Sequence, residues 1–181
     1  MSSTRSQAIQ QHCEKAFKSK ATRLTFDKGP AHDLPEDFCV LEIAPIENRP
    51  VWFYVSCGMS FADANPIEIY LISPRQAVEH LELFYAIAHY HMTGEALDTG
   101  HTVNFGRPWM PRSTCEYGLL SVLNGEIDWA EIEGKNVHFL WLIPITLEER
   151  DFKIEFGLDA LDERFADADV DCANPSRESA V

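Results

Sequence analysis

The sequence predicts an α+β (mixed α/β) fold, in which a central mixed, largely antiparallel sheet packs against flanking helices. Three observations predict it. Two strand patterns separated by the turn residues 47–50 indicate a hairpin, which favours antiparallel pairing. Residues 137–143 are almost continuously apolar, which is typical of a central strand covered on both faces. Helical and strand patterns alternate only loosely, which argues against a doubly wound parallel sheet.

The first 37 residues predict a helix followed by a loop. Residues 6–20 place apolar side chains on one stripe, with lysines on the opposite face. The stripe consists of Ile9, Cys13, Ala16 and Phe17. Residues 27–37 contain a Gly-Pro and a Leu-Pro step, which predict a loop. We expect residues 1–37 to pack on the core as a helix and loop.

Three strands and a long helix should follow, as the first part of a main domain at residues 38–166. Residues 38–46 and 51–57 predict the hairpin, and residues 67–72 predict a third strand. Ser73 suits the N-cap of the helix and the proline after it suits the first helical position. The helix should extend to about His91, and its apolar face comprises Ala77, Val78, Leu81, Phe84, Ile87 and Ala88.

The second half of this domain predicts more strands and two short helices. Strands are expected at residues 101–105, 118–123 and 137–143. Thr146 and Glu149 have the spacing of a capping box, so a helix should start there and end near Gly157. A second helix should cover residues 158–165. Residues 167–181 are acidic, small and polar, and predict a disordered tail.

Charge limits the classes of partner. The net charge is −14, although residues 1–23 alone carry five basic residues against one acidic residue. An acidic field repels phosphates, so no nucleic acid partner is expected, and a basic protein partner is favoured. The alternative is that the negative charge serves solubility alone. The longest apolar runs are far shorter than the ~20 residues of a membrane span, so no membrane partner is expected either.

The five cysteines point to a reducing compartment. Their number is odd and no pair has CxxC spacing, so neither a disulfide framework nor a zinc site is indicated. Residues 1–11 are polar, so we expect no signal peptide. Free thiols in a cytoplasmic protein are the simplest interpretation.

Residues 100–109 couple a strand to a rigid aromatic turn and hold the first candidate site residues. His101 follows Gly100, and Asp98 is close enough in sequence to orient the imidazole. His101 is therefore a candidate ligand contact or general base, or else a hydrogen-bonded histidine that fixes the loop. With His89, His91 and Glu95 these residues could bind a metal, but His89 and His91 would point about 200° apart on a helix. We expect no metal, no cofactor and no catalytic residues.

The segment 107–112 is a candidate interface loop. Two prolines stiffen it, and Arg107, Trp109 and Arg112 are residue types that anchor protein interfaces. The alternative is that Trp109 folds onto the core as a lid. Other motifs are missing from the sequence: we find no GxSxG, GxGxxG or P-loop, and no basic stripe interleaved with aromatic residues.

Three segments in order resemble the suppressor of fused (SUFU) domain family. Residues 50–60 and 66–71 resemble its strand ending in Thr-x-Gly-x-Ser and the strand that follows, with Ser56 in place of threonine. The pair Gly100-His101, with Pro108, is similar to the family's Gly-His segment. Residues 137–149, with Gly157, resemble its Ile-Thr-x-x-Glu signature after a hydrophobic strand. The resemblance covers roughly residues 38–165.

The resemblance implies a mixed sheet with flanking helices and a protein-binding function. Animal members restrain Gli-type transcription factors with the help of a second, C-terminal domain, for which the residues after Phe165 are too few. Stand-alone bacterial members are similar to immunity proteins of polymorphic toxin systems. The family offers no catalytic residues that can be transferred to this chain.

We therefore expect a cytoplasmic, non-enzymatic module that sequesters or neutralises a protein partner, with an immunity role against a basic toxin as its specific form. Contacts would come from an open sheet edge by strand addition or from the loop 107–112, and such an edge would also permit a homodimer. The expected partner-binding residues are Asp98, His101, Arg107, Trp109 and Arg112. Two alternatives remain: a small metal- or His-dependent hydrolase that uses His101 with Asp98, Glu95 or His91, and a regulatory scaffold.

Overall fold

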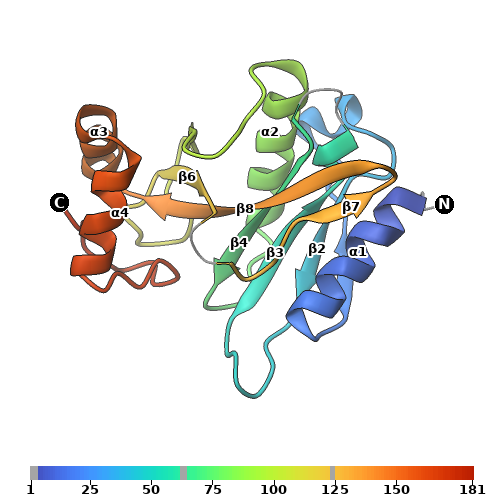
Figure 1. Ribbon diagram of the computed structural model, residues 1–181, viewed down its shortest axis with the longest axis horizontal. Helices are drawn as coiled ribbons and strands as arrows, with labels where there is room; N and C mark the ends of the chain where they lie inside the picture. The colour runs from blue at the N-terminus through green and yellow to red at the C-terminus, as the bar shows by residue number, and fades with distance from the viewer. Residues whose placement is uncertain (1–3, 62–64, 123–124) are drawn as a thin grey trace.

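The protein folds around one mixed sheet, which confirms the predicted fold class (Figure 1). The computed structural model describes residues 4–61, 65–122 and 125–181. Within them the strands are β1 (Ala21–Leu24), β2 (Cys39–Ile43), β3 (Trp52–Cys57), β4 (Ile67–Ser73), β5 (Thr102–Asn104), β6 (Tyr117–Ser121), β7 (Ala130–Ile132) and β8 (Lys135–Ile145). The helices are α1 (Thr4–Phe17), α2 (His80–Thr93), α3 (Leu147–Phe156) and α4 (Leu158–Asp167), with short 3-10 turns η1 (Gly29–Asp33) and η2 (Met59–Phe61).

The strand order is β1-β2-β3-β4-β8-β6-β5, and β7 pairs with the beginning of β8. The strands β4 and β8 are parallel, and the other neighbours are antiparallel. The strand β8 is long and central, as its apolar run predicts, because it pairs with three other strands along its length. This order leaves β1 and β5 at the two edges of the sheet.

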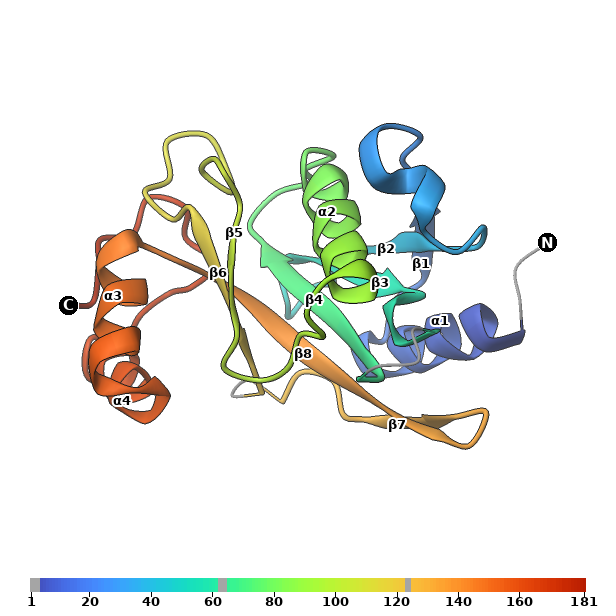
Figure 2. The same ribbon diagram turned by 90° about the horizontal axis from the view of Figure 1, so that it is seen from above.

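Helices cover both faces of the sheet (Figure 2). The predicted apolar stripe of α1 packs on one face, where Ile9, Cys13 and Phe17 are buried against side chains of β2, β3 and β4. Helix α2 packs on the opposite face through residues such as Phe84. Helices α3 and α4 sit at the far end of β8, and their apolar cluster centres on Leu161. None of the helices within the described residues is long and apolar enough to cross a membrane.

Helix α2 begins at His80, so the prediction that Ser73 caps it is wrong. Strand β4 extends to Ser73, which pairs with Trp52 of β3. The Ser73 hydroxyl donates to the Arg75 carbonyl at 2.7 Å and also lies 3.2 Å from Nε2 of His80. The serine therefore closes a turn at the end of a strand. The predicted end is correct, because α2 stops at Thr93 before Gly94.

The predicted start of α3 is confirmed. The Thr146 hydroxyl accepts from the Glu149 N–H at 3.2 Å, and the Glu149 carboxylate accepts from the Thr146 N–H at 2.9 Å. The helix ends before Gly157, which has a positive φ of 92° that suits glycine. Helix α4 follows at once, as predicted.

The prediction of a disordered tail at residues 167–181 is wrong. Arg177 is buried and forms two hydrogen bonds with the fully buried Glu149, at 2.6 and 2.7 Å, and a third with the Pro144 carbonyl at 2.8 Å. The Ala180 N–H also donates to Glu149, and Cys172 is buried nearby in the α3–α4 cluster. The tail therefore folds back onto α3 because Arg177 forms an ion pair with the buried carboxylate of Glu149.

Candidate functional site

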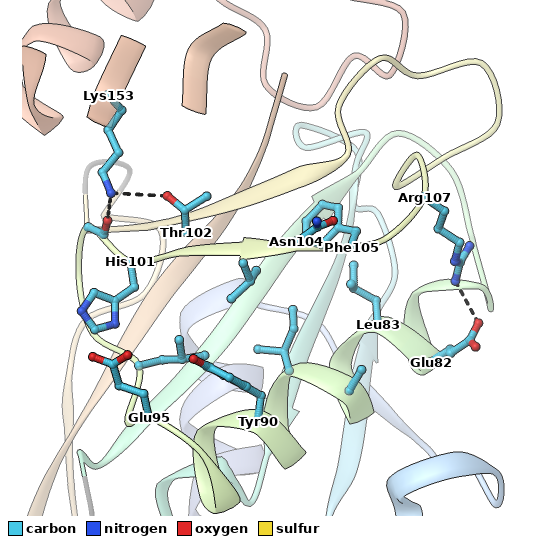
Figure 3. A pocket seen from close by; sticks show the side chains of 15 residues that line it. Glu82, Leu83, Tyr90, Glu95, His101, Thr102, Asn104, Phe105, Arg107 and Lys153 are labelled. Atoms are coloured by element: carbon cyan, nitrogen blue, oxygen red, sulfur yellow. Dashed lines mark hydrogen bonds and ion pairs between the residues drawn. The ribbon is translucent and has the colours of Figure 1, made fainter. Parts of the chain in front are cut away.

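A cavity of about 700 Å³ lies between helix α2 and the edge strand β5 (Figure 3). We call it the α2–β5 groove. Its wall on α2 includes Leu83, Ile87 and Tyr90, and its opposite wall includes Val103 and the other residues of β5. Charged side chains lie at its two ends: Glu82 with Arg107 at one, and Glu95, His101 and Lys153 at the other. Such a cavity, with apolar walls and a few polar groups, is typical of a binding site.

The pair Gly100-His101 forms a bulge that starts β5. Gly100 has a positive φ of 83° and donates its N–H to the Leu120 carbonyl at 2.7 Å. The Leu120 N–H donates in turn to the His101 carbonyl at 3.0 Å. Gly100 and His101 therefore both lie opposite the single residue Leu120. This is the pattern of a bulge whose first residue is a left-handed glycine. The bulge explains why glycine precedes this histidine, and it leaves the Gly100 carbonyl outside the ladder.

The backbone of β5 presents an open edge to the groove. His101 and Phe105 bond through their backbones to β6 and to the residue before it, because His101 accepts from Leu120 and Phe105 donates to Glu116 at 2.9 Å. In an antiparallel ladder alternate residues bond to the same neighbour. The backbone N–H and C=O groups of Thr102 and Asn104 therefore point away from β6, on the side where the sheet has no further strand.

Lys153 of α3 reaches across to the start of this edge (Figure 3). Its ammonium donates to the Gly100 carbonyl and to the Thr102 hydroxyl, the latter at 3.3 Å. Among the residues that the structure describes, no carboxylate lies within 4.0 Å of it. Burial lowers the pKa of Lys153. Lys153 is therefore a half-buried cation to which the described part of the chain offers no counter-charge.

His101 and Asp98 lie at the same end of the groove, but not as a catalytic pair. The Asp98 backbone N–H donates to Nδ1 of His101 at 3.2 Å, and the Asp98 carboxylate accepts from the Thr99 N–H at 2.7 Å. The carboxylate thus shapes the turn instead of orienting the ring. In the neutral ring Nε2 carries the proton and can donate. The groove can therefore use His101 as a polar contact.

The other predicted histidines do not converge on His101. His91 is buried in the core: Nδ1 accepts from the Leu97 N–H at 3.0 Å, and Nε2 lies 3.1 Å from the Asn65 carbonyl. His89 lies 3.3 Å from Asp33 instead. Within residues 4–61, 65–122 and 125–181, no group of three or more His, Cys, Asp or Glu side chains is arranged to hold a metal ion.

The loop 107–112 separates its three predicted contact residues. Trp109 is buried and stacks on the imidazole of His80, with ring centroids 5.6 Å apart, as the lid alternative predicts. Arg107 lines the groove and forms an ion pair with Glu82 at 3.0 Å. Arg112 is exposed, with a positive φ of 72°, and does not line the groove. Of the three, only Arg107 lies at the candidate site.

Sequence reasoning missed the residues of the groove that lie on α2 and α3. Leu83 and Tyr90 are apolar or aromatic residues outside the predicted stripe of α2, and this was an available signal. Lys153 gave no signal of its own. It meets Gly100 only because α3 packs beside the start of β5.

Comparisons with known proteins agree with the fold. A family model described as suppressor of fused protein (SUFU) matches residues 35–178. A protein described as a SUFU homologue from Neisseria gonorrhoeae FA 1090 is 29% identical, with a TM-score of 0.87 over 98% of this chain and 97% of that one. None of the curated protein sequences matches this chain.

Two more distant structures share the fold alone. A chain of a structure described as the Sufu–Fu complex is 12% identical, with a TM-score of 0.69 over 89% of this chain and 83% of that one. Suppressor of Fused from Drosophila is 13% identical, with a TM-score of 0.70. The match covers 95% of this chain but 50% of the Drosophila chain.

Proposed function

Because this chain belongs to the suppressor of fused family, we propose that it is a protein-binding module that holds a segment of a partner protein in the α2–β5 groove. The family supports the class of function, since one of the structures that share its fold is described as a Sufu–Fu complex. The partner of that relative is not carried over to this chain.

The open edge of β5 beside an apolar groove is the observation that carries the proposal. An extended segment can add to such an edge through backbone hydrogen bonds to Thr102 and Asn104. Its alternate side chains would then face the wall formed by Leu83, Ile87 and Tyr90. Backbone pairing gives affinity in this mode, and the side-chain wall gives specificity.

The charge of the chain supports a basic partner. A net charge of −14 would steer a basic protein into contact at a high rate that falls as salt is added. The specific form of the proposal is immunity: the module neutralises a basic toxin of its own host. If the role is immunity, a host that lacks this protein should be killed by the toxin. If the protein is a scaffold, its loss should not make the partner lethal.

Site-specific cross-linking in the native host tests the proposal. Ala86 is exposed on α2 and lines the groove, so a photo-reactive residue at this position should capture the partner. Glu131 is exposed on β7 and lies outside the groove, and the same photo-reactive residue there is the matched control. We expect one protein to be captured at position 86 and not at position 131, and co-purified at low salt. Equal capture at both positions, or none, would contradict the proposal.

A further inference from the structure

We propose that the α2–β5 groove takes the C-terminus of a partner chain, which runs antiparallel to β5 and places its terminal carboxylate on Lys153. This inference rests on the proposed function and specifies its ligand. Four features of the groove lead to it: the end of the open edge, a cation that no described carboxylate pairs with, the direction of pairing and the length of the edge.

Lys153 closes the open edge at one end. Its ammonium donates a hydrogen bond to the carbonyl of Gly100, which the bulge directs out of the ladder. A partner strand that pairs with Asn104 and then Thr102 therefore finds no free acceptor beyond Thr102. A segment in the middle of a chain would have to leave the groove at this point, whereas a chain end can simply stop there.

At this end of the groove Lys153 is the charge that attracts an anion, and Glu95, which lines the same end, is the charge that opposes it. Two of the three N–H groups of the ammonium are used by Gly100 and Thr102, which leaves one donor. The described residues provide no carboxylate within ion-pair distance. Arg107, the cation at the other end, is already paired with Glu82. Lys153 is therefore the cation of the groove that is ready to receive a carboxylate.

The position of the cation also selects the direction of the partner strand. A strand antiparallel to β5 runs from Asn104 toward Gly100, so its carboxyl end reaches Lys153. A parallel strand would bring its amino end there, and an ammonium would meet an ammonium. Two ammonium groups in contact in a partly buried site repel each other, whereas a carboxylate–ammonium hydrogen bond is favourable.

The exposed edge is short, which suits a chain end. Strand β5 spans only Thr102–Asn104, and the Gly106 N–H donates back to the Asn104 side chain at 2.7 Å as the chain turns away. About three residues of the partner can pair within these limits, and a few backbone bonds alone bind weakly. A terminal carboxylate on Lys153 adds the stronger, charge-assisted bond that such a short segment needs.

Two peptide pools test the inference with the full chain. The pools consist of the same acetylated pentapeptides and differ only at the carboxyl end, which is a free carboxylate in one pool and a carboxamide in the other. Peptides retained by the protein are counted by mass spectrometry. We expect about tenfold greater retention of the free carboxylates, the ratio that a difference of about 1.4 kcal/mol produces.

Variants at Lys153 assign the preference to this side chain. Lys153→Met should remove the preference, and Lys153→Arg should retain it, while the melting temperatures of both are compared with the wild type. Equal retention of the two pools by the wild type, or an unchanged preference in Lys153→Met, would overturn the inference.

The cross-link at position 86 distinguishes failure of the inference about Lys153 from failure of the proposed function. If a partner is captured there through its C-terminal peptide, the inference is supported. If an internal segment of the partner is captured, the groove binds protein but the role of Lys153 is refuted. If position 86 captures nothing, the proposed function itself is contradicted.

Discussion

At the residue scale, the buried carboxylate of Glu68 organises the turn after β3. It accepts from the backbone N–H groups of Gly58, Met59 and Ser60 at 3.0 to 3.2 Å. The hydroxyls of Ser56 and Ser60 also donate to it, at 2.5 and 2.7 Å. Burial raises the pKa of Glu68, and the hydrogen bonds from Ser56 and Ser60 oppose that rise. The motif around residues 56–60 is thus a cradle for one carboxylate.

Glu68→Gln should therefore destabilise the protein. The amide keeps one acceptor oxygen but turns an NH₂ group toward N–H donors in a site without water access. We expect the free energy of unfolding in urea to fall by about 3 kcal/mol or more. The exposed Glu126→Gln serves as the control and should change it by less than about 0.5 kcal/mol. A similar effect of both substitutions would contradict the role of the cradle.

His80 should make the free energy of unfolding fall as the pH is lowered. Burial lowers the pKa of His80 from 6.5 to about 4. As the pH falls from about 6.5 toward 4, the unfolded chain binds a proton that the folded protein does not, so the free energy of unfolding falls. The shift corresponds to about 3 kcal/mol lost across this interval. Burial lowers the pKa of His91 in the same direction.

The variant His80→Gln isolates this contribution. Urea unfolding of the wild type and the variant at pH 4 to 7 should show a shallower pH dependence in the variant, since His91 and the carboxyl groups are unchanged. Equal slopes would show that the stacked pair of His80 and Trp109 does not resist protonation.

At the element scale, the C-terminal segment acts as a strap on α3. Arg177 is 8% exposed, and burial lowers its pKa, but the hydrogen bonds and charge of Glu149 outweigh this and raise it. Removal of one partner leaves the other charge buried and unpaired. Arg177→Met should therefore lower the free energy of unfolding by about 3–5 kcal/mol. The exposed Lys15→Met is the control and should have little effect.

A double variant separates the ion pair from simple loss of packing. If Arg177 and Glu149 act as a pair, Arg177→Met combined with Glu149→Gln should cost clearly less than the sum of the two single substitutions. Additive costs would mean that the two residues stabilise the strap independently.

The elements that sequence predicts well are those fixed by neighbours in the chain. The capping box of Thr146 and Glu149 and the stop at Gly157 are local, so their positions are correct. Ser73 also looks like a cap, but its strand pairing with Trp52 overrides that preference. The acidic composition of the tail predicts disorder. The tail is ordered because one arginine, Arg177, pairs with the buried carboxylate of Glu149, 28 residues earlier.

At the scale of the whole molecule, the groove exists only because distant segments meet. Lys153 and Gly100 are 53 residues apart and come together where α3 packs beside the start of β5. Sequence reasoning found His101 and Arg107 through their residue types, and both line the groove. It also favoured Trp109 as an anchor, which the structure buries in the core. No local pattern marks an open strand edge, since the pairing of β5 depends on the whole sheet.

Partner binding by a proline variant of β5 tests the central claim most directly. The Asn104 N–H points away from β6, so Asn104→Pro removes a donor of the open edge without breaking the sheet. Asn104→Ser keeps that N–H and serves as the matched control. With the partner captured at position 86, titration calorimetry should show at least a tenfold weaker affinity for Asn104→Pro and a nearly unchanged affinity for Asn104→Ser, at similar melting temperatures. Undiminished binding by a folded Asn104→Pro protein would contradict strand addition at the α2–β5 groove.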